Sequence, residues 1–415
     1  MCTGAPRMAQ RRTFLTRTGG PLLGDRWHMP VLLASAAVIG LGVIGFGAYA
    51  MFYGPGSHYP GPVRKLLREA GKAYMRPPGK QDLPAALEKY TEALQLLDEL
   101  GSTDLKHAPD APHVTGLVAR IGSVYWDMGD LDGAISAYTD LLRRILGEQG
   151  MEDARTQVRR LMDPELPVEQ RQNILRALGC ANKLAEAYEA REARTKRRSA
   201  LRVDGDMGSA DVQAASRWYQ WCLQLVMLTY QNHYNHQRLE NNQPPVSTPS
   251  FEPDTLPRFF SVDIVTSLFY NAAAFFAAHA QYSYAVPLLQ RALDLMRGET
   301  EKGTETCVCR SSVLMSHMAN ASVQMADLPA AERWSIEGLA LAKRFPANSD
   351  CLNSFIALTY DLGIVYEAAA KPESARVQFR QAIEVASAVG DADAERLAST
   401  ALQRVGGTHH SAAKQ

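Results

Sequence analysis

Two short groups of side chains have residue types that could do chemistry. Cys307 and Cys309 form a Cys-x-Cys pair that could be oxidised or titrate, and His233 and His236 lie three residues apart, the spacing at which two imidazoles share one face of a helix. Residues two apart on a helix point away from each other, so we expect the two cysteines to be buried, idle thiols. For the histidines we expect a polar helix end and no metal site.

The sequence carries none of the short motifs that position catalytic or cofactor groups. It lacks a GxxxxGK[ST] phosphate loop, an HExxH zinc motif, a GxSxG nucleophile turn and a dinucleotide glycine fingerprint. Its 44 Lys and Arg balance 44 Asp and Glu, and a neutral chain lacks the excess positive charge that nucleic-acid binding requires. We therefore expect a protein that is not an enzyme, holds no cofactor and no metal, and binds no nucleic acid.

One segment near the amino terminus has the length and composition of a membrane span. The 23 apolar residues from Val31 to Tyr53 contain no charge and would extend about 34 Å as a helix, enough for a hydrocarbon core of about 30 Å. We predict a single transmembrane helix over residues 30–53, embedded in the lipid bilayer. One face could pair with another membrane helix, or the glycines could be incidental to a lipid-facing helix; its small residues are Ala36, Gly40 and Gly47.

The residues before the span predict a destination in the cell. Residues 1–24 contain four Arg and no acidic residue, with Thr interspersed among apolar residues, so we interpret residues 1–29 as a mitochondrial presequence-like tail. A signal-anchor of the endoplasmic reticulum is the alternative. Arg26 before the span is closer to it than Arg64 after it, so we place the amino terminus in the matrix. The prediction is a single-pass protein of the mitochondrial inner membrane with its larger part in the intermembrane space.

The remaining chain has helical periodicity nearly throughout and contains a repeated pair of helices. Gly122 precedes Ala134 by 12 residues, Gly363 precedes Ala375 by 12, and each alanine is followed four residues later by an aromatic residue. A small residue in the first helix, helix A, and an alanine in the second, helix B, allow two backbones to approach closely. The pattern resembles the tetratricopeptide repeat (TPR), which implies an all-α fold of stacked helix pairs.

Weaker copies complete a predicted TPR-like α-solenoid of about six helix pairs. The third copy contains an insertion with a basic run from Arg191 to Arg202, which we expect to be solvated, as an extended helix or a loop. The Pro-rich residues 241–258 exclude helix and predict a flexible or polyproline linker between repeats over 58–240 and 259–405, with a disordered tail over 406–415. The weaker copies pair Gly71 with Ala86, Gly179 with Ala215, Ala273 with Ala285, and Ala319 with Ala331.

A TPR array presents a concave groove lined by helix A of each repeat, in which extended peptides or helices lie. Counting from the small residue of each helix A predicts a groove that is basic in its first half and aromatic and polar in its second. A basic groove suits acidic groups or a terminal carboxylate. We expect Trp126 to contribute most to binding. The predicted groove residues are Arg68, Lys72, Ser123, Trp126, Arg176, Lys183, Tyr270, Asn320, Tyr360 and Glu367.

The order of segments along the chain carries a further resemblance. The presequence, the span, the segment Tyr59-Pro60-x-x-Val63-x-x-Leu66-Leu67-Arg68, the block Ala85-Ala86-Leu87-Glu88-Lys89-Tyr90 and a widely spaced TPR array are similar to fungal mitochondrial inner-membrane TPR proteins. Those proteins are substrate adaptors of the i-AAA protease. The resemblance implies that this chain binds unfolded or unassembled membrane proteins and delivers these clients to the protease complex for proteolysis, as part of protein quality control.

Two other functions fit the same architecture. One is an assembly factor for a respiratory complex, of the type that assists complex III, and the other is a structural tether between two complexes. An adaptor should bind many unfolded clients, whereas an assembly factor should bind one complex. The endoplasmic reticulum alternative predicts a glycan on Asn320, because Asn320-Ala321-Ser322 is an acceptor sequence.

Overall fold

The computed structural model describes residues 59–412 apart from 78–79, 102–103, 200–208 and 248–250. The predicted presequence and transmembrane helix, with Ala36, Gly40 and Gly47, lie outside these residues. Within the described ranges, no helix combines the length and the apolar character that crossing a membrane requires.

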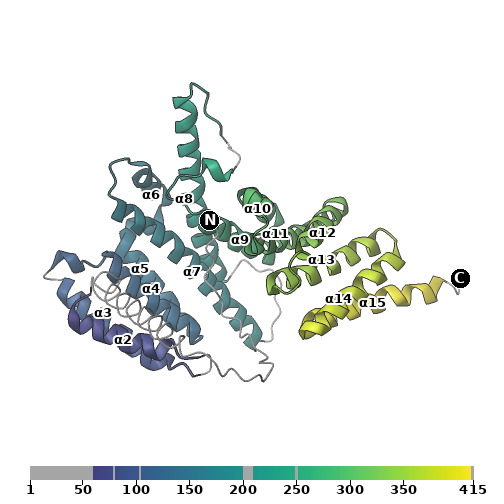
Figure 1. The fold of residues 1–415 in the computed structure, drawn as a ribbon, viewed down its shortest axis with the longest axis horizontal. Helices are drawn as coiled ribbons and strands as arrows, with labels where there is room; N and C mark the ends of the chain where they lie inside the picture. Colours follow the sequence, from purple (N-terminus) through teal and green to yellow (C-terminus); the bar gives the residue numbers. More distant parts are fainter. Residues whose placement is uncertain (1–58, 78–79, 102–103, 200–208, 248–250, 413–415) are drawn as a thin grey trace, which may run out of the picture. The chain divides into compact units, whose positions relative to one another are not determined.

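The described part of the chain is helical, without a strand, as the periodicity predicts (Figure 1). Fourteen α-helices and two short 3-10 helices, η2 (Leu105–His107) and η3 (Pro253–Thr255), follow one another. The α-helices are α2 (Gly61–Tyr74), α3 (Leu83–Gly101), α4 (Pro112–Asp127), α5 (Leu131–Glu152), α6 (Ala154–Met162), α7 (Val168–Ser199), α8 (Ala210–Glu240), α9 (Val262–Ala278), α10 (Tyr282–Glu301), α11 (Glu305–Gln324), α12 (Leu328–Ala342), α13 (Ser349–Ala368), α14 (Pro372–Val389) and α15 (Ala392–Ala412).

The chain forms two compact units, and the boundary between them falls inside α5, after Ala137. The described part of the first unit is residues 59–137, and that of the second is residues 138–412. The sequence predicted a division at the Pro-rich residues 241–258 instead. That segment lies within the second unit, because it is fastened to the helices beside it.

The predicted helix pairs are present as hairpins of consecutive helices. Helix α2 packs on α3, α7 on α8, α9 on α10, α11 on α12 and α13 on α14. In the remaining pair, Gly133 near the start of α5 lies against the ring of Tyr125 in α4. Each predicted helix-B alanine is fully buried: Ala86, Ala134, Ala215, Ala285, Ala331 and Ala375.

The small residue of helix A has its predicted role in the last hairpin. A Cβ atom added to Gly363 would lie 2.5 Å from an edge carbon of the buried Phe379 ring, so only glycine allows α13 and α14 to approach this closely. The matching prediction for Gly179 is wrong, because this residue is exposed on α7 and a Cβ there would meet no atom within 4 Å. The long insertion separates Gly179 from the helix crossing.

The turns within four hairpins share one conformation. Gly129, Ala280, Ala326 and Ala370 have φ between 56° and 72°, and each stands seven residues after the small residue of its helix A. The backbone N–H that follows donates to a carbonyl five residues back, as from Lys371 to Tyr366 at 2.9 Å. This left-handed cap reverses the chain in a few residues. The 12-residue spacing in the sequence is the length of this cap plus the flanking helical turns.

The insertion in the third repeat lengthens both helices of the hairpin. Helices α7 and α8 contain 32 and 31 residues, about ten more than the helices of the later hairpins. Arg191, which the sequence assigned to a solvated basic run, forms a two-point ion pair with Asp211 at 2.6 and 2.9 Å. The extended-helix alternative therefore holds as far as Ser199, and Arg191 connects the two long helices.

The Pro-rich segment is packed and not flexible where the structure describes it. Phe251 is buried and stacks on Tyr230 of α8 with ring centroids 4.0 Å apart. The Tyr230 hydroxyl and the Thr255 hydroxyl are 2.6 Å apart in η3, and Leu256 is also buried. The prolines prevent regular helix, as predicted. The apolar residues between them bind the segment to α8 and α9.

The carboxyl-terminal helix covers the end of the last hairpin. Ala401 and Val405 of α15 pack on Ala375 and Phe379 of α14, and α15 continues to Ala412. The sequence predicted a disordered tail from residue 406. The helical face that buries Val405 against the hairpin accounts for the continuation, since burial of apolar surface stabilises a helix more than its intrinsic propensity does.

We predict opposite effects for alanine at two helix-A glycines. Gly363→Ala should destabilise the fold by about 1–3 kcal/mol, because the new methyl group overlaps the Phe379 ring. Gly179→Ala should stabilise it by about 0.5–1 kcal/mol, because alanine is the better helix former at an exposed site. Denaturant unfolding followed by circular dichroism measures both. Equal effects of the two substitutions would contradict the assigned packing.

Candidate functional site

Four of the predicted groove residues belong to the unit of residues 59–137. Arg68 and Lys72 are exposed on α2. On α4, the Ser123 hydroxyl donates to the carbonyl of Ala119 at 3.1 Å, and Trp126 is half-buried where the sequence predicted an exposed side chain. The structure therefore leaves two cations of α2 and part of one indole ring accessible in this unit.

The other six predicted residues belong to the second unit, and several of them are engaged in bonds within the fold. Arg176 donates to Asn173 at 3.0 Å, and the Lys183 ammonium forms an ion pair with Glu186 at 2.6 Å. Glu367 on α13 receives two hydrogen bonds from Arg404 of α15, at 2.6 and 2.7 Å. The predicted basic character of the first half is therefore partly neutralised on α7. The ring of Tyr360 lies 5.7 Å from that of Phe379.

The helix-A positions are connected by polar contacts between successive repeats. Asn271 of α9 donates to Glu186 of α7 at 2.7 Å. The hydroxyl of Tyr270 lies 3.1 Å from Nε2 of His317 in α11, and Asn320 of α11 hydrogen-bonds to Asp361 of α13. Tyr270 and Asn320 thus join neighbouring repeats as well as lying on the predicted face.

Asp361 is a carboxylate buried at the crossing of α11 and α13, with 4% of its surface exposed. Burial raises the pKa of Asp361 to about 7, and the hydrogen bond from Asn320 opposes that rise. Burial likewise raises the pKa of Glu189 on α7 to about 7, against the hydrogen bond from Tyr219. Desolvation disfavours the charged form of a carboxylate, so each of these groups is easier to protonate than an exposed one.

A pocket of about 230 Å³ lies on the face formed by the first halves of α9 and α11. Met296, Val313 and Leu314 give it an apolar surface, and Arg310 and Asp350 bring charges of opposite sign to it. Arg310 also forms an ion pair with Asp263 at 2.8 Å. Its lining is completed by Thr266, Ser267 and Tyr270. Of the ten predicted groove residues, Tyr270 is the member that lines this pocket.

A disulfide bond stands next to both charges of this pocket. Cys309 of α11 is bonded to Cys351 of α13, 42 residues later in the chain. Arg310 follows the first cysteine, and Asp350 precedes the second. The prediction of an idle thiol is therefore wrong for Cys309, although the prediction that Cys307 and Cys309 are buried is confirmed. The partner of Cys309 belongs to the next repeat, so local spacing gave no signal for the bond.

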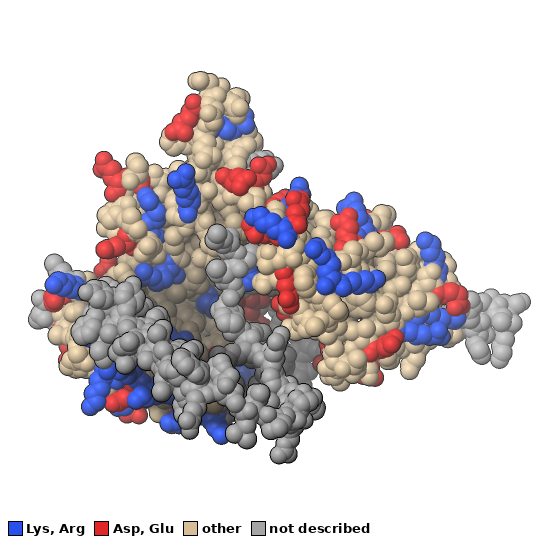
Figure 2. Space-filling model, in the orientation of Figure 1, with Lys and Arg blue, Asp and Glu red and all other residues tan. Residues whose placement is uncertain are grey.

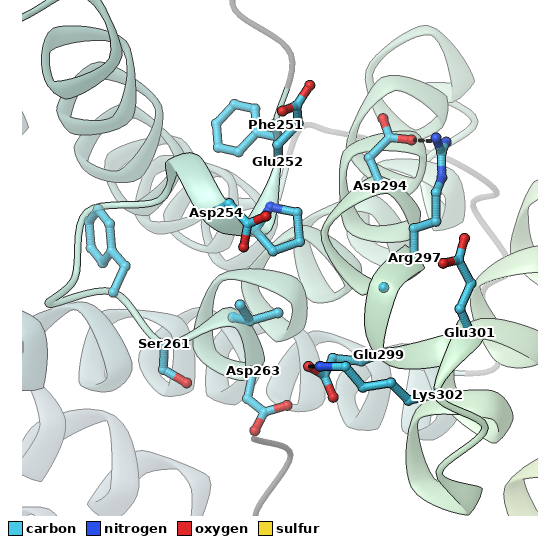
Figure 3. Close-up of a pocket in the computed structure, with 14 residues that line it drawn as sticks. Phe251, Glu252, Asp254, Ser261, Asp263, Asp294, Arg297, Glu299, Glu301 and Lys302 are labelled. Carbon is cyan, nitrogen blue, oxygen red and sulfur yellow. Dashed lines mark hydrogen bonds and ion pairs between the residues drawn. The ribbon is translucent and has the colours of Figure 1, made fainter. Parts of the chain in front are cut away.

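A larger and more polar pocket of about 900 Å³ lies where the Pro-rich segment and the start of α9 meet the end of α10 (Figure 3). Its carboxylates are largely paired: Asp294 with Arg297 at 2.9 Å, and Glu299 with Lys302 at 2.6 Å. Glu252, Asp254 and Glu301 add further negative charge. Among the described residues, no group of three or more His, Cys, Asp and Glu side chains could hold a metal ion.

The described surface mixes charges of both signs, as the balanced composition predicts. Over α10 to α15 in Figure 2, Lys and Arg side chains alternate with Asp and Glu. No extended surface of one sign is visible on that face of these helices. Recognition there must depend on local pockets and on individual charges, such as those of Arg310 and Asp350.

Comparison with solved structures identifies other helical proteins. BtubC from P. vanneervenii shares 14% identity, covers 74% of this chain and 92% of its own, and superposes with a TM-score of 0.45. The TPR2AB domain of yeast Sti1, in complex with pHSP90, shares 11% identity over 83% of this chain and 98% of its own, with a TM-score of 0.28. Yeast Tom70 shares 12% identity over 84% and 96%, with a TM-score of 0.15. No protein-family model and no curated protein matches the sequence.

We predict that neutralising Asp361 stabilises the protein at neutral pH. Because its pKa is higher in the folded state, the stability that its proton contributes is complete below about pH 4 and is lost as the pH rises through 7. Asp361→Asn should therefore gain on the order of 2–4 kcal/mol at pH 8, relative to wild type, and lose this pH dependence. Unfolding measured from pH 4 to 8 tests this. The exposed Asp393→Asn is the control, and a gain there of the same size would contradict the assignment.

We predict that the Cys309–Cys351 disulfide stabilises the second unit by about 2–4 kcal/mol, the range expected for a closed loop of this length. The double variant Cys309→Ala/Cys351→Ala should unfold at lower denaturant concentration than the oxidised wild type. Peptide mapping by mass spectrometry without reductant should find the two cysteines linked. Cys180→Ala, at a buried free thiol, is the control and should retain the link. Recovery of both cysteines as free thiols from the native protein would refute the bond.

Proposed function

We propose that this protein is a membrane-anchored adaptor of the mitochondrial inner membrane. Its helical repeats bind unfolded or unassembled membrane proteins in the intermembrane space and deliver these clients to the i-AAA protease, which performs the proteolysis. The proposal joins the anchor predicted from residues 30–53 to a repeat array that offers side chains for binding.

The observation that carries the proposal is the pocket between α9 and α11. It combines apolar surface from Val313 and Leu314 with one cation and one anion. An unfolded polypeptide offers both apolar side chains and unpaired backbone N–H and C=O groups, and this pocket can satisfy both kinds of group. Neighbouring helix-A residues extend the same polar and apolar character along α9, α11 and α13.

The disulfide supports the proposed side of the membrane. Disulfides persist in oxidising compartments and are rare in reducing ones. A bond between Cys309 and Cys351 therefore favours the intermembrane space over the matrix for the repeats. The lumen of the endoplasmic reticulum is equally oxidising, and a glycan on Asn320 would distinguish it.

The proposed mechanism is a gain in local concentration. The span places the repeats beside the membrane, and its small-residue face, Ala36, Gly40 and Gly47, contacts the membrane helices of the protease. A client segment held by the repeats then meets the protease at an effective concentration set by the anchor and not by diffusion through the compartment. The chain itself supplies recognition and proximity.

Two variants should separate the partners of the full-length protein. Gly40→Leu/Gly47→Leu should reduce recovery of the protease severalfold and leave clients bound, because the bulky side chains prevent close helix pairing. Trp126→Ala should reduce recovery of clients and leave the protease bound, because it removes the accessible ring on α4. Immunoprecipitation from detergent-solubilised mitochondria, followed by mass spectrometry, measures both.

The control is Ile336→Ala, at an exposed position on helix B of the fifth repeat, which should change neither recovery. The far-ultraviolet circular dichroism of every variant should match wild type. Recovery of a single respiratory complex without the protease would replace the adaptor with an assembly factor. Equal recovery of two complexes, with no unfolded client, would favour a tether.

A further inference from the structure

We propose that the pocket between α9 and α11 is a specificity subsite that takes one aliphatic side chain of an extended polypeptide. Arg310 and Asp350 bind the main chain of that polypeptide on either side of the inserted residue. The inference rests on the proposed function in one respect: the partner must be a polypeptide.

The size of the pocket selects a single side chain. Its volume of about 230 Å³ is below the roughly 300–1,000 Å³ of pockets that enclose whole small molecules. Met296, Val313 and Leu314 offer aliphatic and thioether contacts. A Leu, Ile, Val or Met side chain therefore gains dispersion contacts and loses contact with water on entering, whereas a charged side chain would be desolvated there.

An unsatisfied hydroxyl group gives the pocket a polar anchor. Thr266 lines the pocket and is 95% buried, and its Oγ1 atom has no hydrogen-bond partner. A buried hydroxyl without a partner costs free energy in the isolated protein. A main-chain carbonyl of the entering residue could accept the hydrogen bond that Thr266 lacks, after rotation about χ1 of the threonine, which has two accessible rotamers in a helix.

The two charges match the alternating groups of an extended main chain. Arg310 donates one Nη1 hydrogen bond to Asp263 at 2.8 Å and has further N–H groups on its guanidinium. Asp350 lies at the start of α13 and is exposed, so its carboxylate can accept from a main-chain N–H. A cation for C=O and an anion for N–H are complementary to one residue of extended backbone. The disulfide holds these two charges on neighbouring helices at a fixed separation.

The chain contains a matched pair of threonines with which to test this. Thr229 on α8 is fully buried and its hydroxyl also has no partner, but it does not line the pocket. Replacing either threonine by valine keeps the shape and removes the unsatisfied hydroxyl. Both variants should therefore be as stable as wild type or more so. Thr266→Val alone should weaken binding.

The probe is a peptide selected from a random twelve-residue display library on the full-length protein in detergent, then synthesised with a fluorescent label. Selected peptides should share Leu, Ile, Val or Met at one position, and replacing that residue by Asp should abolish binding. Thr266→Val should weaken affinity about fivefold, the value of one hydrogen bond, in fluorescence anisotropy titrations. Val313→Phe, which fills the pocket, should abolish binding, and Thr229→Val should leave the affinity unchanged.

The inference would be overturned by selected peptides without a shared aliphatic position, or by equal affinities of wild type, Thr266→Val and Val313→Phe. It would also be overturned by a library from which no peptide is enriched. These outcomes leave the proposed function standing if immunoprecipitation still recovers clients with the protease. Loss of those partners from the wild-type protein would instead refute the proposed function.

Discussion

The close approach of two helices within each hairpin is the constraint on which the rest of the structure depends. Where α13 crosses α14, the absence of a side chain at Gly363 admits the ring of Phe379, and the buried Ala375 lets the backbones meet. Replacement of either small residue would separate the helices. Because each repeat packs on the next, such a separation would also displace the helix-A face on which the pocket between α9 and α11 lies.

The sequence predicts this constraint well, because it is local. A small residue, a left-handed turn and an alanine 12 residues later lie within one stretch of chain, so their spacing is visible without knowledge of the fold. The hairpin positions are accordingly confirmed from Ala86 to Ala375. The exception is Gly179, where two lengthened helices moved the glycine away from the crossing.

Features that depend on contact between repeats could not be predicted in the same way. The bond between Cys309 and Cys351 and the ion pair of Arg310 with Asp263 connect residues more than 40 positions apart. Counting from the small residue of helix A selected Tyr270 but not Thr266, which lies two helical turns earlier. In the Pro-rich segment, prolines indicated the absence of regular helix correctly, whereas the burial of Phe251 on Tyr230 depends on a partner 21 residues away.

The covalent link between α11 and α13 has a mechanical consequence. Helical-repeat arrays deform easily because each hairpin is held only by its neighbours, so a load applied along the array bends every joint a little. The link between Cys309 and Cys351 makes one joint much stiffer than the others. When a client is pulled away from this protein, the strain should concentrate in the joints without such a link, and the segment that carries Arg310 and Asp350 should keep its shape until the client is released.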